Sequence, residues 1–306
     1  MPNDATPARA LDYSIVDVFT TAALAGNPLA VVMNTAGLTS EQMQSIAREF
    51  NLSETTFVER RSASIEEAEG VRVRIFTTEE ELPFAGHPTL GTASVLRLNA
   101  PEVVRDSVVT LAENVGPIPV RFSGDDSLFA EMTQRDPQFG AELNPAEVAR
   151  LCGLSPADLD PSATPQVVST GNPFAIVLLR SSEALGRLRV SQDEATTWLR
   201  ARGARWFYVM STTPNPNQPT QKEFRARMQF NGGEDPATGS AAGCAVSYLV
   251  KRGLAPSGER LLIRQGVEMG RSSEIYVSAT CANTEVTNIR VGGSTVLVAK
   301  GKLFLP

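Results

Sequence analysis

The chain has a single histidine, His87, and its position in the sequence is suited to chemistry. It follows Gly86 in a loop between residues 72–75, which alternate polar and apolar, and a helix-spaced apolar segment that begins near Pro88. A helix that starts there leaves its first backbone N–H groups facing the loop, and such groups bind anions without a basic side chain. A lone histidine whose ring is satisfied by backbone groups fits the same pattern.

A second stretch repeats this arrangement and adds an acidic candidate. Residues 224–249 match residues 71–96, with Gly239 at the place of Gly86. Ser240 follows Gly239, and the loop before them contains Asp235 followed by proline. Asp235 therefore has two readings, a functional carboxylate or a cap of the second helix.

A shorter pair of matching segments supports an internal duplication. Residues 26–32 read Gly-Asn-Pro-Leu-Ala-Val-Val, and residues 171–177 read Gly-Asn-Pro-Phe-Ala-Ile-Val. Two pairs of matching segments in the same order predict that one ancestral half was duplicated once. A solenoid is not predicted, because such arrays need three or more short repeats.

Composition limits the classes of partner. The 306 residues predict about two domains. A net charge of −6 and the lack of a basic run argue against nucleic acid or an anionic membrane as partner. No run of about 18 apolar residues is present, so we expect no membrane span. Three cysteines lie far apart without metal or redox spacing, which predicts reduced thiols, no metal site and a cytoplasmic location: Cys152, Cys244 and Cys281.

The pattern of short strands and few helices predicts an α+β fold. We expect two pseudo-symmetric lobes, each a curled, mostly antiparallel sheet around one central helix. The predicted domains are residues 1–126 and 127–306, and it stays open whether the last strands cross back to the first lobe. Residues 1–10 are interpreted as a loose leader and residues 61–70 as a polar surface turn.

If the lobes are copies, the N-termini of both central helices should point into one cleft. Backbone N–H groups there suit a carboxylate or a developing oxyanion. Glu54 is a further candidate because it stands where a turn enters a strand, although most acidic residues are simply solvated. Neither glycine loop carries a phosphate-binding or dinucleotide motif, and no Ser–His–Asp elbow is visible.

The sequence resembles the phenazine-biosynthesis PhzF-like family, which is related to diaminopimelate epimerase. The resemblance covers nearly the whole chain and includes NLSETTFV at 51–58, RIFTTEEELPFAGHPTLGTA at 74–93, EDPATGSAAG at 234–243 and QGVEMGR at 265–271. It implies the two-lobed epimerase fold, no cofactor, an active site between the lobes and a homodimer. It also implies the site residues: Glu54 for proton transfer, with His87, Asp235, Gly86, Gly239 and Ser240 around the substrate.

Two departures from the wider superfamily affect the expected chemistry. Epimerase and proline-racemase relatives use one cysteine from each half, whereas the glycine-loop positions here hold none. Cys244 instead lies inside the second helix, at the place of Gly91 in the first. Residues 228–234 are shorter than the usual family stretch, which predicts a different pocket rim.

The leading functional hypothesis is a cofactor-independent isomerase of a small cyclic or aromatic-precursor carboxylate, similar to trans-2,3-dihydro-3-hydroxyanthranilate isomerase. Glu54 takes a proton from an activated carbon and returns it elsewhere, and burial is expected to raise the pKa of such a base. One alternative is a single-base epimerase or tautomerase of a small amino or hydroxy acid. Another is a carboxylate-binding or interaction protein without turnover.

Overall fold

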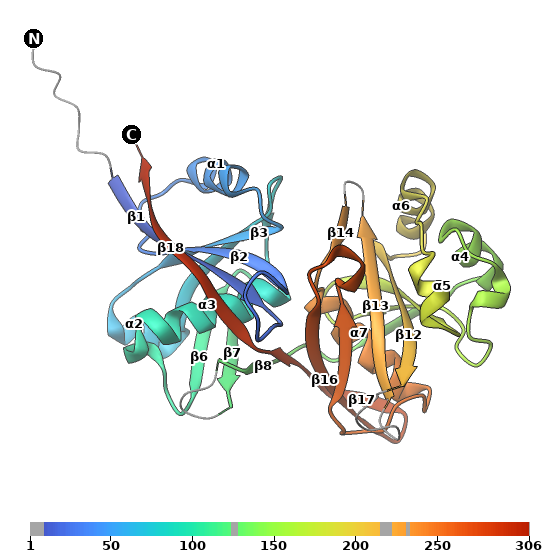
Figure 1. Ribbon diagram of the computed structural model, residues 1–306. Helices are drawn as coiled ribbons and strands as arrows, with labels where there is room; N and C mark the ends of the chain where they lie inside the picture. Colours follow the sequence, from blue (N-terminus) through green and yellow to red (C-terminus); the bar gives the residue numbers. More distant parts are fainter. Residues whose placement is uncertain (1–8, 124–127, 215–221, 231–232, 306) are drawn as a thin grey trace, which may run out of the picture. The chain divides into compact units, whose positions relative to one another are not determined.

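The computed structural model describes residues 9–123, 128–214, 222–230 and 233–305 (Figure 1). The described residues divide into two compact units. The first holds residues up to 24, residues 28–130 and residues from 294 on, and the second holds residues 25–27 and 131–293. The chain therefore passes from the first unit to the second and returns with its final strand.

The first unit is a mixed sheet with three helices against its strands, one of them central. Its strands are β1 (Arg9–Val18), β2 (Asn27–Val32), β3 (Glu54–Glu59), β4 (Val71–Phe76), β5 (Glu81–Leu82), β6 (Val108–Glu113), β7 (Gly116–Phe122) and β18 (Thr295–Leu305). Its helices are α1 (Ser40–Phe50), α2 (Ala63–Glu69), α3 (Gly86–Asn99) and the short 3-10 turn η1 (Pro101–Val103). β18 pairs antiparallel with β1 over the full length of β1, from Arg9 opposite Leu305 to Val18 opposite Thr295.

The second unit has the same kinds of element. Its strands are β8 (Ala130–Thr133), β9 (Gln138–Glu142), β10 (Gln166–Ser169), β11 (Pro173–Leu179), β12 (Trp206–Pro214), β13 (Lys222–Phe230), β14 (Gly233–Asp235), β15 (Leu261–Gln265), β16 (Ser273–Ala282) and β17 (Glu285–Gly293). Its helices are α4 (Pro145–Leu151), α5 (Ser182–Gly186), α6 (Gln192–Arg200) and α7 (Gly239–Lys251), with 3-10 turns η2 (Pro156–Asp158) and η3 (Val267–Met269).

The strand pairings of the two units follow one plan. In the first unit β2 and β3 are parallel, β3 and β4 antiparallel, β4 and β5 antiparallel, β4 and β6 parallel, and β6 and β7 antiparallel. The series β11, β12, β13, β14, β15 and β16 repeats these pairings in the same order. Residues 71–96 and 224–249 thus share the order strand, short hairpin strand, helix, which agrees with the predicted duplication.

An ion pair stands at the same place in each copy. Arg74 of β4 pairs with Glu81 of β5 through Nε–Oε1 and Nη2–Oε2 distances of 2.8 and 2.5 Å. Arg227 of β13 pairs with Glu234 of β14 through the same atoms at 2.8 and 2.6 Å. A two-point contact of guanidinium and carboxylate fixes direction as well as distance. Each pair therefore fastens the hairpin that leads into a central helix.

The two central helices are buried over most of their length. α3 is buried from Gly86 to Leu96 and packs against β1, β3, β6, β7 and β18. α7 is buried over almost its whole length and packs against β10, β11, β16 and β17. Both sequences are rich in glycine, alanine, serine and threonine, which lets strands approach the helix backbone closely. A helix surrounded in this way has no polar face, so the usual amphipathic signal is absent.

Four sequence-based expectations need correction or fall partly outside the described residues. Residues 63–69 were expected to form a turn but form the helix α2. This helix has no buried residue, so its sequence shows no apolar stripe. Ion pairs such as Arg60–Glu66, at 2.9 Å, hold it in place. The supposed leader is wrong at Arg9 and Ala10, which belong to β1. The predicted boundary near residues 123–126 and part of the stretch 228–234 fall on residues 124–127 and 231–232, which lie outside the described residues.

In the described part of the chain, none of the helices combines the length and apolar character needed to cross a bilayer.

We predict that Gly91→Ala destabilises the first unit. A Cβ atom at Gly91 lies 2.6 Å from Leu29 Cδ2 and 2.8 Å from Val18 Cγ2, both in the core. Overpacking costs about 1–3 kcal/mol, which exceeds the gain of about 1 kcal/mol from alanine in a helix. Urea unfolding should show a lower free energy of unfolding. Gly186→Ala in α5 is the control, because its Cβ meets no atom within 4 Å; equal stability of the two variants contradicts the packing argument.

Candidate active site

Glu54 and His87 meet within the first unit. Glu54 begins β3, directly after the turn in which Asn51 ends α1 in a left-handed conformation. His87 is the second residue of α3, and its side chain is 5% exposed. The His87 Nε2 atom lies 3.5 Å from Glu54 Oε2, whose side chain is 16% exposed. A strand start and a helix start thus bring a carboxyl and an imidazole into contact.

The hydrogen bonding of the histidine ring limits where protons can sit. The ring bonds the backbone of Pro28, which offers only a carbonyl, so the ring must donate there. Because Nε2 faces Glu54, we assign the donated proton to Nδ1. Burial lowers the pKa of His87 to about 3, so the ring is neutral near neutral pH and Nε2 is an acceptor. A proton on Glu54 Oε2 therefore points at an atom that can accept it.

The central helices begin without side-chain caps. The N-cap of α3 is Ala85, which has no capping group. The N-cap of α7 is Thr238, whose hydroxyl donates to Asp235 Oδ2 at 2.6 Å and does not cap the helix. Thr39 and Asn144, by contrast, cap α1 and α4 with their side chains. The helix starts at Gly86 and Gly239 consequently keep backbone donors that a substrate anion can use.

Asp235 is held within the second unit by donors on three residues. Asn27 Nδ2 donates to Oδ1 at 2.8 Å, and the Thr238 hydroxyl and the backbone of Ala237 also bond the carboxylate. These bonds favour the charged form, but burial outweighs them and raises the pKa of Asp235 to about 6. Asp235 thus organises the loop before α7 and is not itself the helix cap.

Sequence reasoning missed the residues that support this loop. Gln265 Nε2 donates to the Asp235 carbonyl at 2.8 Å and to Thr238 Oγ1 at 2.9 Å, and Gln265 Oε1 accepts from the Thr238 N–H. Gly266 has a φ of +73°, and a Cβ there would lie 2.7 Å from the Pro236 carbonyl oxygen. The signal was present, since both residues open the QGVEMGR block.

The duplicated positions differ in chemistry. Leu29 of β2 pairs with Glu54, and its duplicate Phe174 of β11 pairs with Trp206, so Trp206 is the counterpart of Glu54. Both central helices begin with a glycine, and the residues that follow, His87 and Ser240, are counterparts. The structure brings Glu54, Gly86 and His87 together in the first unit. Asp235, Gly239 and Ser240 lie together in the second unit, at the start of α7.

Two of the three thiols, those of Cys152 and Cys244, are buried. Cys244 is fully buried within α7, 3.5 Å from the Thr170 hydroxyl, and burial raises the pKa of its thiol to about 11. Burial likewise raises the pKa of Cys152 to about 12. Among the described residues, no three His, Cys, Asp or Glu side chains are grouped to bind a metal ion.

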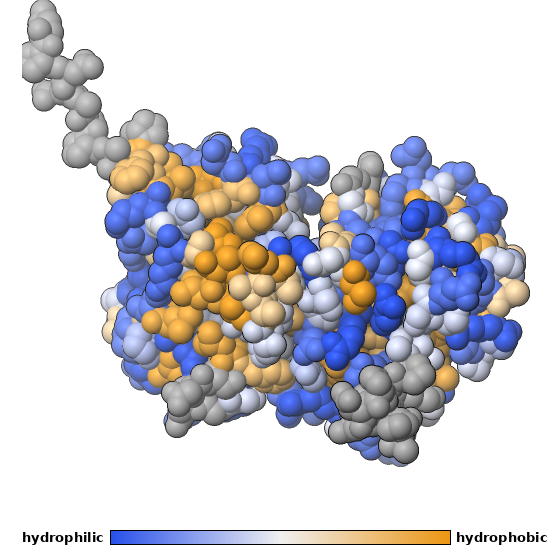
Figure 2. All heavy atoms as spheres, viewed as in Figure 1, coloured by the Kyte–Doolittle hydropathy of each residue, from blue (hydrophilic) through white to orange (hydrophobic). Residues whose placement is uncertain are grey.

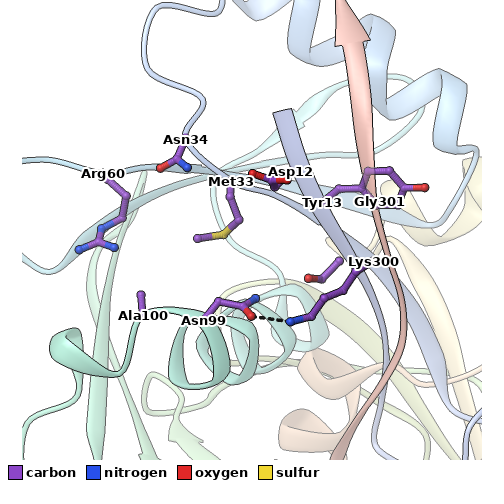
Figure 3. A pocket seen from close by; sticks show the side chains of 10 residues that line it. Asp12, Tyr13, Met33, Asn34, Arg60, Asn99, Ala100, Lys300 and Gly301 are labelled. Atoms are coloured by element: carbon purple, nitrogen blue, oxygen red, sulfur yellow. Dashed lines mark hydrogen bonds between the residues drawn. The ribbon is translucent and has the colours of Figure 1, made fainter. Parts of the chain in front are cut away.

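A separate cavity of about 380 Å³ occupies the first unit (Figure 3). Its walls come from β1, β18, the end of β2 and the C-terminal end of α3. The Lys300 ammonium donates to Asn99 Oδ1 at 2.7 Å across it. None of the predicted site residues lines this cavity; its lining is Asp12, Tyr13, Ser14, Met33, Asn34, Arg60, Asn99, Ala100, Lys300 and Gly301. The cavity is therefore distinct from the candidate site.

We predict that Asn27→Ala lowers both stability and activity more than Asn172→Ala, its duplicate counterpart. Asn27 is fully buried, and its amide joins Asp235 Oδ1 and the Ala237 carbonyl, whereas Asn172 is partly exposed. Leaving buried acceptors without a donor costs about 1–3 kcal/mol. Urea unfolding and turnover of the two variants provide the measurement, and equal effects would remove the special role of Asn27.

Comparison with known proteins gives consistent matches over the whole chain. The family model described as phenazine biosynthesis-like protein matches residues 16–301. An uncharacterised isomerase from Mesorhizobium japonicum is 37% identical, covering 96% of this chain and 99% of the relative. The trans-2,3-dihydro-3-hydroxyanthranilate isomerase of Pseudomonas aeruginosa is 33% identical with the same coverage.

The fold has close counterparts among solved structures. The structure of a predicted epimerase from Pseudomonas aeruginosa matches with a TM-score of 0.80 at 34% identity, over 96% of this chain and 99% of that one. The predicted α+β, epimerase-like fold is thereby confirmed. With its family model, its relatives and its fold in agreement, the chain belongs to the phenazine biosynthesis-like (PhzC-PhzF) family and is an isomerase.

Proposed function

We propose that the protein is a cofactor-independent isomerase that moves a proton on a small cyclic or aromatic-precursor carboxylate, with Glu54 as the general acid and base. The contact between Glu54 Oε2 and His87 Nε2 at 3.5 Å is the observation that carries the proposal. It places a carboxylate beside a neutral acceptor. A carboxylate in that position gains a hydrogen bond to His87 Nε2 only when it takes up a proton, which favours removal of a proton from carbon.

The remaining residues are assigned to holding the substrate and the proton. Glu54 removes a proton from an activated carbon, His87 accepts the resulting O–H hydrogen bond, and Glu54 returns the proton at another carbon. Each unit offers backbone donors for an anionic group of the substrate, at Gly86 in the first unit and at Gly239 and Ser240 in the second. Asp235 orients the substrate; burial raises its pKa to about 6, so near neutral pH it is mainly the carboxylate, a hydrogen-bond acceptor.

The substrate class rests on the relatives. Two more trans-2,3-dihydro-3-hydroxyanthranilate isomerases, from Pseudomonas chlororaphis and Pseudomonas fluorescens, are each 32% identical over 96% of this chain. Their named substrate is a cyclic amino carboxylate. We carry over that chemical class, a ring with a carboxylate and an acidic C–H, without the individual compound.

The rival readings make different demands on the site. Two-base epimerisation needs an acid–base group in each half, but the counterpart of Glu54 is Trp206 and both buried thiols are held neutral. A single-base epimerase remains a distinct alternative that inverts one carbon and moves no double bond. A non-catalytic binding protein exchanges no substrate hydrogen with solvent.

We predict that Glu54→Gln keeps the fold and ligand binding but loses about 10²–10⁴-fold in turnover, because the amide cannot accept the proton. The assay is deuterium incorporation from solvent into candidate carboxylates first selected by thermal shift. NMR of the product then separates proton transfer to a new carbon from inversion at the same carbon.

Two variants serve as controls for this experiment. Glu49→Gln removes a carboxylate from the exposed face of α1 and should leave turnover unchanged. Cys244→Ala should also retain turnover, because its thiol is buried and neutral. Full activity of Glu54→Gln, or inactive but folded Cys244→Ala, refutes the mechanism.

We also propose that the protein is a cytoplasmic homodimer. Apolar residues gather on the face of the first unit that Figure 2 presents. Leu98 of α3 and Leu297 and Phe304 of β18 are large apolar residues of the first unit that are exposed, with exposed fractions of 44%, 37% and 66%. Exposed apolar clusters are typical of protein interfaces. The scattered, reduced cysteines agree with a cytoplasmic location.

Phe304→Glu should therefore shift the solution mass toward the monomer, which light scattering after size exclusion measures directly. Ile65→Glu, at an exposed position of α2, is the control and should leave the mass unchanged. A wild-type protein that is monomeric at all concentrations contradicts the dimer.

A further inference from the structure

Glu113 is a buried carboxyl group with no part in the mechanism above. It is the last residue of β6 and is 5% exposed. Its Oε1 lies 2.7 Å from the Thr89 hydroxyl, while its Oε2 is buried and has no hydrogen-bond partner in the described part of the chain. Ionising this carboxyl group inside the protein costs free energy, because the buried carboxylate accepts at most one hydrogen bond, whereas in water it would accept several.

The number of hydrogens on the Thr89 hydroxyl decides which group donates in its contact with Glu113. The Thr89 hydroxyl lies 2.7 Å from the Ala85 carbonyl oxygen as well as 2.7 Å from Glu113 Oε1. A hydroxyl has one hydrogen and can donate to only one of these oxygens. Both contacts can be hydrogen bonds at the same time only if the hydroxyl donates to the Ala85 carbonyl, because a carbonyl can never donate. The contact with Glu113 is then attractive only if Glu113 carries a proton and donates it to Thr89 Oγ1.

The duplicate position in the second unit is occupied by a permanently neutral donor. Arg72 pairs with Ala112 in β4 and β6, and Arg225 pairs with Arg264 in β13 and β15. The next residues, Glu113 and Gln265, are therefore counterparts. Gln265 Nε2 donates to Thr238 Oγ1, and Thr238 is the N-cap of α7.

Each copy thus braces the N-cap of its central helix through a hydroxyl. In the second unit the chain of contacts runs from Gln265 to Thr238. In the first unit it runs from Glu113 through Thr89 to the carbonyl of Ala85, which precedes Gly86 and His87. A protonated glutamic acid has nearly the shape of glutamine and can supply the same donor.

We propose that Glu113 is held as the neutral acid and acts as a positioning residue, fixing through Thr89 the start of α3 and with it the ring of His87. Loss of the proton removes the donor and places a negative charge next to the first turn. The helix start then loosens, and the distance between His87 and Glu54 is no longer fixed. The link to turnover rests on the proposed function, whereas the protonation of Glu113 does not.

The sign of the pH dependence follows from the shift in pKa. Burial raises the pKa of Glu113 to about 8 from 4.5, against the opposing effects of Thr89 and of Arg72, the charged group that acts on it. The folded protein keeps this proton while the unfolded chain releases it. The stability that Glu113 contributes is therefore complete below about pH 4.5, falls as the pH rises, and is lost above about pH 8.

The first test compares the melting temperature of wild type and Glu113→Gln between pH 5 and pH 9. Because the amide cannot ionise, the melting temperature of the variant relative to wild type should rise steadily up to about pH 8. Glu49→Gln, on the surface of α1, should follow wild type throughout. Parallel curves for Glu113→Gln and wild type overturn the proposal, whatever the enzyme's reaction is.

The second test reads the position of His87 directly. Since the chain has one histidine, the tag-free protein gives one set of imidazole NMR signals, and no assignment is needed. In wild type these signals should move or broaden as the pH passes about 8. In Glu113→Gln the same transition should be absent, while Thr89→Val should show perturbed signals at all pH values. A transition that persists in Glu113→Gln shows that Glu113 does not position His87.

Turnover distinguishes failure of this inference from failure of the proposed function. Glu113→Gln should keep kcat within a few-fold of wild type at pH 7 and extend activity to higher pH, whereas Glu113→Ala should lose activity at every pH. If Glu54→Gln proves active while the stability and NMR results hold, the proposed function fails and the role of Glu113 stands. If Glu54→Gln is inactive but both Glu113 variants behave like wild type, only the present inference fails.

Discussion

The structure depends on one constraint: a helix that offers its first N–H groups to a ligand cannot cap them with its own side chain. α3 and α7 both meet it, one with an alanine at the N-cap and the other with a threonine whose hydroxyl is turned to Asp235. An uncapped end frays unless something else holds it. Here the support comes from the end of a neighbouring strand, from Gln265 in β15 and Glu113 in β6. Burial of the helix along its length supplies the rest.

Duplication explains why one scaffold can hold two unlike sets of groups. The pairing order and the Arg–Glu contacts at the hairpins are shared, so the backbone of each copy is fixed by the same interactions. The side chains at the ends of these elements then differ without cost to the fold. Glu54 and His87 occur in one copy, where the other has Trp206 and Ser240. The asymmetry favours a reaction that needs one acid–base group over one that needs a matched pair.

Much of the fold could be predicted from local signals. The alternating residues 72–75 lie in β4, and the helix expected to start near Pro88 is α3, which begins at Gly86. α2 was not predicted because a helix without a buried face has no periodic pattern of apolar residues in its sequence. The hairpin strands β5 and β14 are too short to show a period of their own.

The site was harder to predict, because its contacts join residues far apart in the sequence. Spacing alone left Glu54, His87 and Asp235 with ordinary interpretations, and it was the family resemblance that singled them out. The meeting of Glu54 with His87 requires β3 and α3 to be placed first. Glu113 could not be selected, since a glutamate at a strand end is unremarkable until its partner is known. Gln265 stands in the QGVEMGR block, but its role depends on partners that are distant in the sequence. The equivalence of Glu113 and Gln265 becomes visible only through the strand register.

The pairing of β1 with β18 has a consequence for how the protein is made. Synthesis on the ribosome delivers β1 long before its partner, with the whole second unit between them. The first unit must therefore wait with one sheet edge open, whereas every segment of the second unit, residues 25–27 and 131–293, is made before β18. Contacts of such long sequence separation form late and slowly. During that interval the edge of β1 that β18 later covers keeps unpaired N–H and C=O groups, which is the kind of edge that pairs with other strands.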